Sequence, residues 1–263
     1  MGFFFAVLAS LANAQTLPNH ADVQAHEDVF DPAQIGAIRF LTTNDFPPLN
    51  FRGAGGELAG FHIDLAAAIC TEISVKCTVQ SWPWEQLGSA MENGQGDAVI
   101  AAVAITPDRA QQMDFSQAYL KFPARFVVRQ QGQLPAKEEN DNKVGVREGS
   151  AQAQFLQAHF KQLELVPFAN ERAALDAVKF ADIDRAFVDG MRASFWLNEN
   201  PDCCTFDDGP YFSSRYFGEG LTIAVKRGSD NTRRAINIAL RRLQENGKFA
   251  ELYLKWFPVN FYD

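Results

Sequence analysis

The chain has 263 residues, of which 47% are hydrophobic and 21% charged, and its formal net charge at pH 7 is -8. This length permits one large domain or two smaller ones, each with a substantial core. No basic stripe is present in the sequence, so nucleic acid and anionic membrane surfaces are poor partners on electrostatic grounds.

The N-terminal segment is typical of a signal peptide. GFFFAVLASLANA is a short apolar stretch that ends in small residues around Asn13, and we expect residues 1–14 to be removed after Ala14. Residues 15–36 are polar, contain Pro18 and Pro32 and show no periodicity, which predicts a flexible leader. No other segment of the sequence is long and apolar enough to span a bilayer.

The four cysteines fit an exported protein. Cys70 and Cys77 lie at the end of an expected helix and at the start of the next strand, and we expect them to form a disulfide in an oxidising compartment. Cys203 and Cys204 are adjacent in a loop. A bond between neighbours needs an unusual backbone, so two free thiols and a bridge to another chain both remain open. The histidines are scattered away from the cysteines, so we expect no metal and no cofactor.

From residue 38 onward, extended and helical patterns alternate. Strands are expected at residues 38–42 and 77–82 and over the apolar run AVIAAVAI, with helices at residues 61–70 and before Gly94. This alternation predicts a mostly parallel sheet with helices outside. Ligands of such sheets bind beyond the carboxyl ends of the strands.

Two aromatic residues follow strands of this expected sheet. Phe46 precedes two prolines that stiffen its loop, so its ring can cover the aliphatic part of a ligand or simply anchor the loop. Trp84 follows the second strand. It can line a pocket, and it suits a core position almost equally well.

Arg109 lies where the apolar run ends. Thr106 can cap a helix there, and Pro107 suits its first turn, which places Arg109 at the carboxyl end of a strand. A guanidinium offers a planar fork of donors for a carboxylate, and a cation in the first turn opposes the helix dipole. Taken alone, the residues support a carboxylate site and a solvated surface position about equally.

The second half of the chain repeats this construction. A strand at residues 144–146 leads to Ser150 at a helix start, where free backbone N–H groups can bind a carboxylate, although Ser150 suits a plain N-cap equally well. A later buried strand ends at Asp189, which can face Arg109 across a cleft or cap the helix that follows. The extended segments near Pro123 and near residues 216–220 suit hinge crossings between two lobes.

Four segments carry a family pattern: GELAGFHIDLAAAIC, DAVIAAVAITPDRAQQMDFSQAY, YFGEGLTIAVKRGSD and ALRRLQENGKFAELYLKWF. They resemble the family 3 extracellular solute-binding proteins, the receptors of polar amino acid ABC importers. The resemblance implies an α/β fold of type II, in which two lobes, each a mostly parallel sheet flanked by helices, are joined by a two-strand hinge. The expected first lobe covers residues 37–121 and 220–263, and the second covers residues 122–219.

The resemblance also implies roles for single residues. The position of Phe46 commonly stacks on the bound amino acid in this family, and the acidic residue that matches Asp189 holds the α-amino group of the ligand. Some members carry a small disulfide loop at the place of Cys70 and Cys77.

The chain departs from the family at three alanines. Ala102, Ala104 and Ala151 stand where Ser or Thr is common, so hydroxyl contacts to the ligand carboxylate are lost while backbone N–H groups remain. We expect a lower affinity or a wider cleft that admits a bulkier amino acid derivative. Asp45 and Glu219 would suit a cationic side chain or lie on the surface.

These patterns lead to one main functional hypothesis and two alternatives. We expect a monomeric periplasmic receptor, not an enzyme, that closes around a free amino acid and docks on an ABC permease of the inner membrane. The first alternative is an exported cyclohexadienyl or prephenate dehydratase on the same fold, in which a cleft carboxylate such as Asp189 acts as general acid. The second is a sensory input module, against which the lack of a signalling domain argues.

Overall fold

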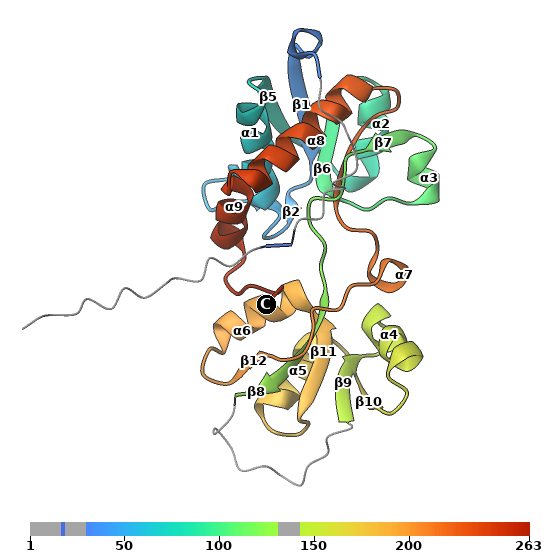
Figure 1. Cartoon of the computed structure of the whole chain (residues 1–263), viewed down its shortest axis with the longest axis vertical. Coiled ribbons are helices and arrows are strands. Elements are labelled where there is room, and N and C mark those ends of the chain that lie inside the picture. Colours follow the sequence, from blue (N-terminus) through green and yellow to red (C-terminus); the bar gives the residue numbers. More distant parts are fainter. Residues whose placement is uncertain (1–16, 19–29, 131–142) are drawn as a thin grey trace, which may run out of the picture.

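The computed structural model describes residues 17–18, 30–130 and 143–263, and two bodies are stacked along its long axis (Figure 1). The expected signal peptide, residues 1–14, lies outside the described residues, and so does most of the expected leader. The described part of the leader includes the short 3-10 helix η1 (Pro32–Gln34). The backbone N–H of Asp31 donates to Asn231 Oδ1 at 3.0 Å, so this part contacts the helix α8 (Asp230–Glu245).

The upper body in Figure 1 is built on a five-stranded sheet in the order β5-β1-β6-β13-β7. The strands in this order are β5 (Lys76–Ser81), β1 (Ala37–Thr42), β6 (Ala98–Val103), β13 (Thr222–Lys226) and β7 (Met113–Phe115). β1 pairs in parallel with β5 and β6, whereas β13 runs antiparallel to β6 and β7. Parallel neighbours need long crossover connections, which the helices of the expected alternation supply.

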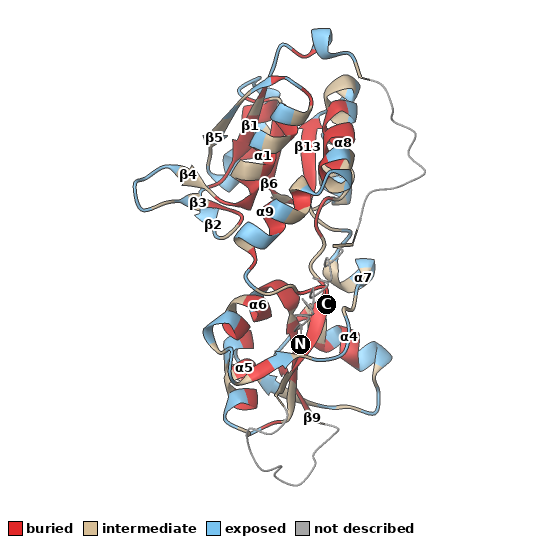
Figure 2. Ribbon diagram, turned by 60° about the vertical axis from the view of Figure 1, so that its left-hand side comes forward, coloured by how far each residue is buried: buried red, intermediate tan, exposed pale blue. Residues whose placement is uncertain are grey.

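Helices cover both faces of this sheet. The helices α1 (Phe61–Glu72), α8 and α9 (Lys248–Trp256) share one hydrophobic cluster with Phe40 of β1. The helix α2 (Leu87–Glu92) shares another cluster with the next residue, Leu41. Successive side chains of a strand point to opposite faces, so β1 is buried on both sides (Figure 2).

The lower body contains a second five-stranded sheet in the order β10-β9-β11-β8-β12. Its strands are β10 (Glu164–Phe168), β9 (Lys143–Arg147), β11 (Arg185–Asp189), β8 (Ala124–Arg129) and β12 (Cys204–Phe206). β9 is parallel to β10 and β11, and β8 is antiparallel to β11 and β12. The helices α5 (Glu171–Lys179) and α6 (Gly190–Glu199) pack on one face, and α4 (Ala151–His159) packs on the other.

Smaller elements complete the two bodies. A three-stranded sheet of β2 (Asp45–Phe46), β3 (Asn50–Arg52) and β4 (Leu58–Ala59) follows β1. The 3-10 helix η2 (Trp84–Gln86) and the short helices α3 (Pro107–Ala110) and α7 (Ser214–Phe217) lie in connections. β2 therefore carries Phe46 at the edge of the upper body, close to the end of β1.

Two extended segments join the bodies, as the sequence predicts. Isolated bridges pair Leu120 with Leu221 and Ala124 with Tyr211, so the outgoing and returning segments run side by side between the sheets. The strands that follow these crossings, β8 and β13, run antiparallel in their sheets. Each sheet is therefore mixed rather than mostly parallel, but the two-lobed α/β fold is confirmed. The lobe boundaries at residues 121/122 and 219/220 stay a prediction.

The C-terminal tail is a further contact between the bodies. After α9, the backbone carbonyl of Phe261 accepts from Arg125 of β8 at 3.1 Å, and the hydroxyl of Tyr262 donates to the carbonyl of Lys121 at 2.7 Å. Figure 1 shows the C-terminus at this junction. In the part of the chain that the structure describes, no helix is both long and apolar enough to cross a membrane.

The four cysteines form two disulfides in the structure. Cys70 and Cys77 form the predicted disulfide, with their Cα atoms 6.1 Å apart. Cys203 and Cys204 are bonded to each other, so the expected alternatives of two free thiols or a bridge to another chain are both wrong. In this loop the second cysteine starts the edge strand β12, and the carbonyls of both cysteines accept hydrogen bonds from Gln130.

We expect the Cys70–Cys77 disulfide to stabilise the upper body. Replacing both residues by Ser removes a short loop closure between α1 and β5, which should lower the free energy of unfolding by about 2–3 kcal/mol. Chemical denaturation in oxidising buffer measures this loss. The Cys203→Ser and Cys204→Ser double variant is the control, because its bond closes no intervening loop. Equal losses of unfolding free energy in the two double variants would contradict a specific stabilising role of the Cys70–Cys77 loop.

Candidate functional site

A pocket of about 330 Å³ lies where strands of the upper sheet end. It is lined by Thr43, Asp45, Phe46, Trp84, Ala101 and Ala102. Thr43 follows β1, η2 follows β5, and the two alanines lie near the end of β6, so the pocket occupies the carboxyl edge of three adjacent strands. This is the place where open α/β sheets bind ligands.

Two aromatic side chains form the exposed wall of this pocket. The residue surface of Phe46 is 39% exposed and that of Trp84 is 43% exposed, so neither ring belongs to the core. The core alternative for Trp84 is therefore excluded by its exposure. Both rings are available to cover apolar parts of a ligand.

The structure fixes Arg109 beside this wall. Thr106 Oγ1 accepts from the backbone N–H of Arg109 at 3.4 Å and so caps α3, as predicted. One terminal nitrogen of the guanidinium donates to the carbonyl of Ala104 at 2.9 Å, and the group lies 5.2 Å from the centre of the Trp84 ring. The side chain is half-buried rather than solvated. A guanidinium has five donors, so most of them remain for a carboxylate held beside Trp84.

The backbone of β6 is distorted at the pocket. Ala102 has a φ of 57°, in the left-handed region that residues with a Cβ rarely adopt. Its neighbours pair irregularly with β13, where Val103 faces Thr222 and Val99 faces Ala224, so β6 carries extra residues in a bulge. Bulges and strained residues concentrate at functional sites, where they redirect the backbone. Ala102 is a predicted site residue, but nothing in the surrounding sequence indicates this distortion.

The remaining predicted residues lie in the lower body. Ser150 is buried, and its hydroxyl accepts from the backbone N–H of Ala153 at 3.1 Å, which is the plain N-cap of α4. Ala151 is the first residue of that helix. Neither residue lines the pocket around Trp84, so a role for them in the same site requires the two bodies to approach each other.

Asp189 ends β11 and caps α6. Its Oδ1 accepts from the backbone N–H of Arg192 at 2.9 Å. Burial, with a smaller contribution from the negative charge of Glu171, raises the pKa of Asp189 to about 6. Glu171 is itself buried at the start of α5, and its Oε2 lies 3.5 Å from a guanidinium nitrogen of Arg192. Arg192 therefore contacts both carboxylates in different ways: its backbone N–H bonds to Asp189, and its guanidinium pairs with Glu171.

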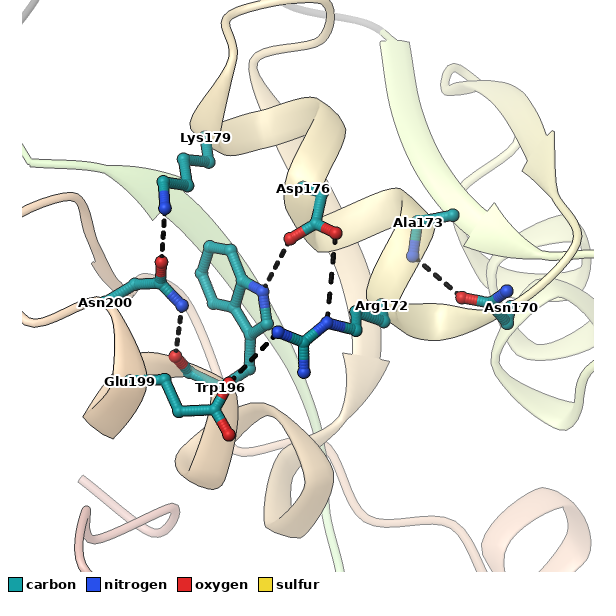
Figure 3. A network of polar contacts seen from close by, with 8 residues as sticks. All are labelled: Asn170, Arg172, Ala173, Asp176, Lys179, Trp196, Glu199 and Asn200. Atoms are coloured by element: carbon teal, nitrogen blue, oxygen red, sulfur yellow. Dashed lines mark hydrogen bonds and ion pairs between the residues drawn. The ribbon is translucent and has the colours of Figure 1, made fainter.

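Polar contacts hold these two helices together (Figure 3). The indole nitrogen of Trp196 on α6 donates to Asp176 of α5 at 2.9 Å. At the far ends of the helices, Lys179 donates to the side-chain oxygen of Asn200 at 2.7 Å. Asn170 caps α5 by accepting from the backbone N–H of Ala173 at 2.8 Å. This network joins α5 to α6 and caps the N-terminus of α5, which carries Glu171.

Asp189 also lies at the junction of the bodies. It is paired with Ala124, the first residue of β8, and the N–H of Gly190 donates to the carbonyl of Pro123 at 2.8 Å. Among the described residues, no hydrogen bond or ion pair joins Asp189 to Arg109, which belongs to the other body. The hypothesis that both hold one ligand stays a prediction.

Larger hollows lie elsewhere on the described surface. A groove of about 650 Å³ runs between α1, α8 and α9, and its lining includes Asp64 and Lys255. These two residues form an ion pair at 2.6 Å, so their charges are already matched within the protein. The smaller pocket is the better candidate because it gathers the aromatic residues and the strand ends expected from the sequence.

Two lining residues, Thr43 and Ala101, are not among those predicted from the sequence. Ala101 has no chemical signal of its own. Thr43 directly follows the end of β1 in the segment TTNDF. A hydroxyl at the carboxyl end of a strand lies where open sheets bind ligands, so the sequence does indicate Thr43 as a site residue. Asp45, which the sequence left open between cleft and surface, lines the pocket.

Comparisons with known proteins agree with this architecture. A relative from Escherichia coli (strain K12), named as a candidate ABC transporter arginine-binding protein 2, is 31% identical over 220 residues, which cover 84% of this chain and 90% of the relative. A Salmonella typhimurium periplasmic binding protein, solved to explain its high arginine specificity, is 29% identical with a TM-score of 0.51, covering 85% of this chain and 100% of the other.

A third comparison concerns the fold alone. The L-cystine solute receptor of Neisseria gonorrhoeae, solved without ligand in an open conformation, superposes with a TM-score of 0.71 at 19% identity, covering 87% of this chain and 95% of the receptor. The family model described as bacterial extracellular solute-binding proteins, family 3, matches residues 38–259, which include both sheets and the pocket. The chain belongs to the family 3 bacterial extracellular solute-binding proteins.

Proposed function

We propose that this protein is the periplasmic substrate-binding component of an amino acid ABC importer. The observation that carries the proposal is the position of Arg109. Its guanidinium is fixed between the Ala104 carbonyl and the Trp84 ring, beside a pocket at the carboxyl edge of the sheet. A planar cation held in this way suits the α-carboxylate of an amino acid. The arginine-binding relative supports amino acids as the ligand class.

The proposed mechanism is closure of the two bodies around the ligand. Arg109 would hold the carboxylate, and Asp189 would hold the ammonium from the other side of the crossing segments. A ligand that contacts both bodies only in the closed form shifts the population toward that form. The closed protein would then dock on a permease in the inner membrane. No covalent step is needed, so we propose a binding protein and not an enzyme.

Isothermal titration tests this function directly. The mature chain, refolded to remove copurified ligand, is titrated with arginine, lysine, histidine, glutamine, cystine and glutamate. Saturable one-site binding of at least one of them is expected. A chain that binds none of these amino acids would argue against the proposal.

The affinity should depend on pH through Asp189. Its pKa near 6 means that the carboxylate is largely protonated at pH 5 and largely ionised at pH 7. Only the ionised form can pair with an ammonium, so the affinity should fall about tenfold as the pH drops from 7 to 5. Titrations across this range measure the effect.

Two variants assign that pH dependence. Asp189→Asn should bind weakly and lose the transition near pH 6. Glu171→Gln removes the neighbouring negative charge, so it should move the transition to lower pH while Arg192 and the helix cap are retained. A wild-type affinity that is constant between pH 5 and 7 would contradict a contact between Asp189 and the ligand ammonium.

One observation favours the dehydratase alternative. The raised pKa of Asp189 is the condition that a general acid in this cleft would have to meet. Incubation with prephenate, followed by a spectral check for phenylpyruvate, tests it. Product formation that Asp189→Asn abolishes would replace the transport proposal by an enzymatic one.

A further inference from the structure

Four buried polar side chains form a hydrogen-bonded chain behind the pocket. Asn50 Nδ2 donates to Thr43 Oγ1 at 2.6 Å, His62 Nδ1 lies 2.7 Å from Asn50 Oδ1, and the Tyr119 hydroxyl lies 2.8 Å from His62 Nε2. None of the four residues is more than 5% exposed. They come from the end of β1, from β3, from α1 and from the segment that leads to the first crossing, so the chain connects the pocket with the junction of the two bodies.

The direction of each hydrogen bond follows from the chemistry of the groups. The Asn50 amide presents its oxygen to His62, and an amide oxygen only accepts, so this arrangement places the hydrogen of His62 on Nδ1. Burial lowers the pKa of His62 to about 3, so the ring is neutral and Nε2 carries a lone pair. The Tyr119 hydroxyl keeps its proton, because burial raises its pKa, and donates to Nε2. Tyr119, His62 and Asn50 therefore each donate in one direction, toward Thr43.

The last group of the chain is the hydroxyl of Thr43. Its oxygen accepts from Asn50, and its own hydrogen is left to be donated. Thr43 lines the pocket together with Phe46 and Trp84. We infer that the chain from Tyr119 through His62 and Asn50 orients the Thr43 hydroxyl as a donor that selects an oxygen acceptor on the ligand.

This inference rests on the proposed function, and it specifies the chemistry of the ligand at one point. A carboxylate, amide or ureido oxygen can accept the hydrogen of Thr43. An ammonium or guanidinium carries donors only, so it would leave that hydrogen unpaired in a nearly buried place. Thr43 is then a specificity-determining residue, and Tyr119, His62 and Asn50 are positioning residues.

The tautomer of His62 reports the direction of these hydrogen bonds, and it can be measured without any ligand. Nitrogen-15 NMR of the free protein should show a neutral ring with its hydrogen on Nδ1 at pH 5 to 7. His62→Gln identifies the signals. A hydrogen on Nε2 would mean that the groups donate toward Tyr119 instead of toward Thr43. That result would overturn the inference whether or not the protein binds amino acids.

Titrations of the wild type, Thr43→Val and Thr43→Ser with L-arginine, L-citrulline, L-glutamine and L-histidine test the donor itself. Thr43→Val should weaken the tightest of these ligands at least about tenfold, and Thr43→Ser should retain wild-type affinity within about threefold. Equal affinity of the wild type and Thr43→Val would overturn the inference and leave the proposed function intact. A wild type that binds none of these four ligands and none of the amino acids titrated above would reject both.

A double-mutant cycle separates positioning from general damage to the hinge. Tyr119→Phe removes only the first donor, and it should weaken binding several-fold in the wild-type background. In the T43V background the same change should have no further effect, because the oriented hydroxyl is already gone. Additive losses would show that Tyr119 acts independently of Thr43 and would overturn its positioning role.

Discussion

Replacing Arg109 by Ala should abolish amino acid binding at ordinary ligand concentrations. Removal of one partner from a buried charge pair costs about 2–5 kcal/mol, which corresponds to a loss of roughly 30-fold to several thousand-fold in affinity. The remaining donors would be backbone N–H groups and the Thr43 hydroxyl, since Ala102 and Ala104 carry no hydroxyl. Isothermal titration with the ligand that binds the wild type most tightly measures the loss.

Arg109→Lys is the matched control for charge. A lysine keeps the positive charge but lacks the planar fork and the stacking on Trp84, so an intermediate affinity is expected. Both variants should fold normally, because α3 is a short helix with no buried residues. Wild-type affinity in Arg109→Ala would show that the carboxylate is held elsewhere, and the proposed arrangement of the ligand would have to be abandoned.

His62 should make the protein less stable in acid. The folded protein keeps this ring neutral down to a pH of about 3, whereas the unfolded chain binds a proton below about 6.5. The unfolded state therefore gains protons first as the pH falls, and stability declines by about 1.4 kcal/mol per pH unit between these values. At pH 4 the loss from His62 alone should reach about 3 kcal/mol, because the ring is fully buried.

Denaturant unfolding of the wild type and His62→Gln between pH 7 and pH 4 measures this contribution. Glutamine can donate to Asn50 and accept from Tyr119, but it does not titrate in this range. The free energy of unfolding of His62→Gln should therefore fall less steeply with decreasing pH than that of the wild type, by the stated slope. His159→Gln provides a histidine control at an exposed position, and it should follow the wild-type curve. Parallel curves for the wild type and His62→Gln would show that His62 is not held neutral by burial.

The sequence alone determined the features that depend on near neighbours along the chain. The alternation of strands and helices, the cap at Thr106 and the placement of Arg109 after β6 all follow from patterns within a few residues. The disulfide between Cys70 and Cys77 is similarly local. The resemblance of four segments to the family extended these local predictions to the two-lobed fold.

Only the tertiary structure decided how distant segments meet. The hydrogen-bonded series of side chains from Thr43 to Tyr119 connects residues that are 76 positions apart in the sequence. Each of these residues by itself suits an ordinary core or loop position. The left-handed conformation of Ala102 and the pairing of Glu171 with Arg192 are equally invisible in the sequence. The physical reason is that hydrogen-bond partners and burial are set by strand order and helix packing. Periodicity and capping report only the conformation of the local backbone.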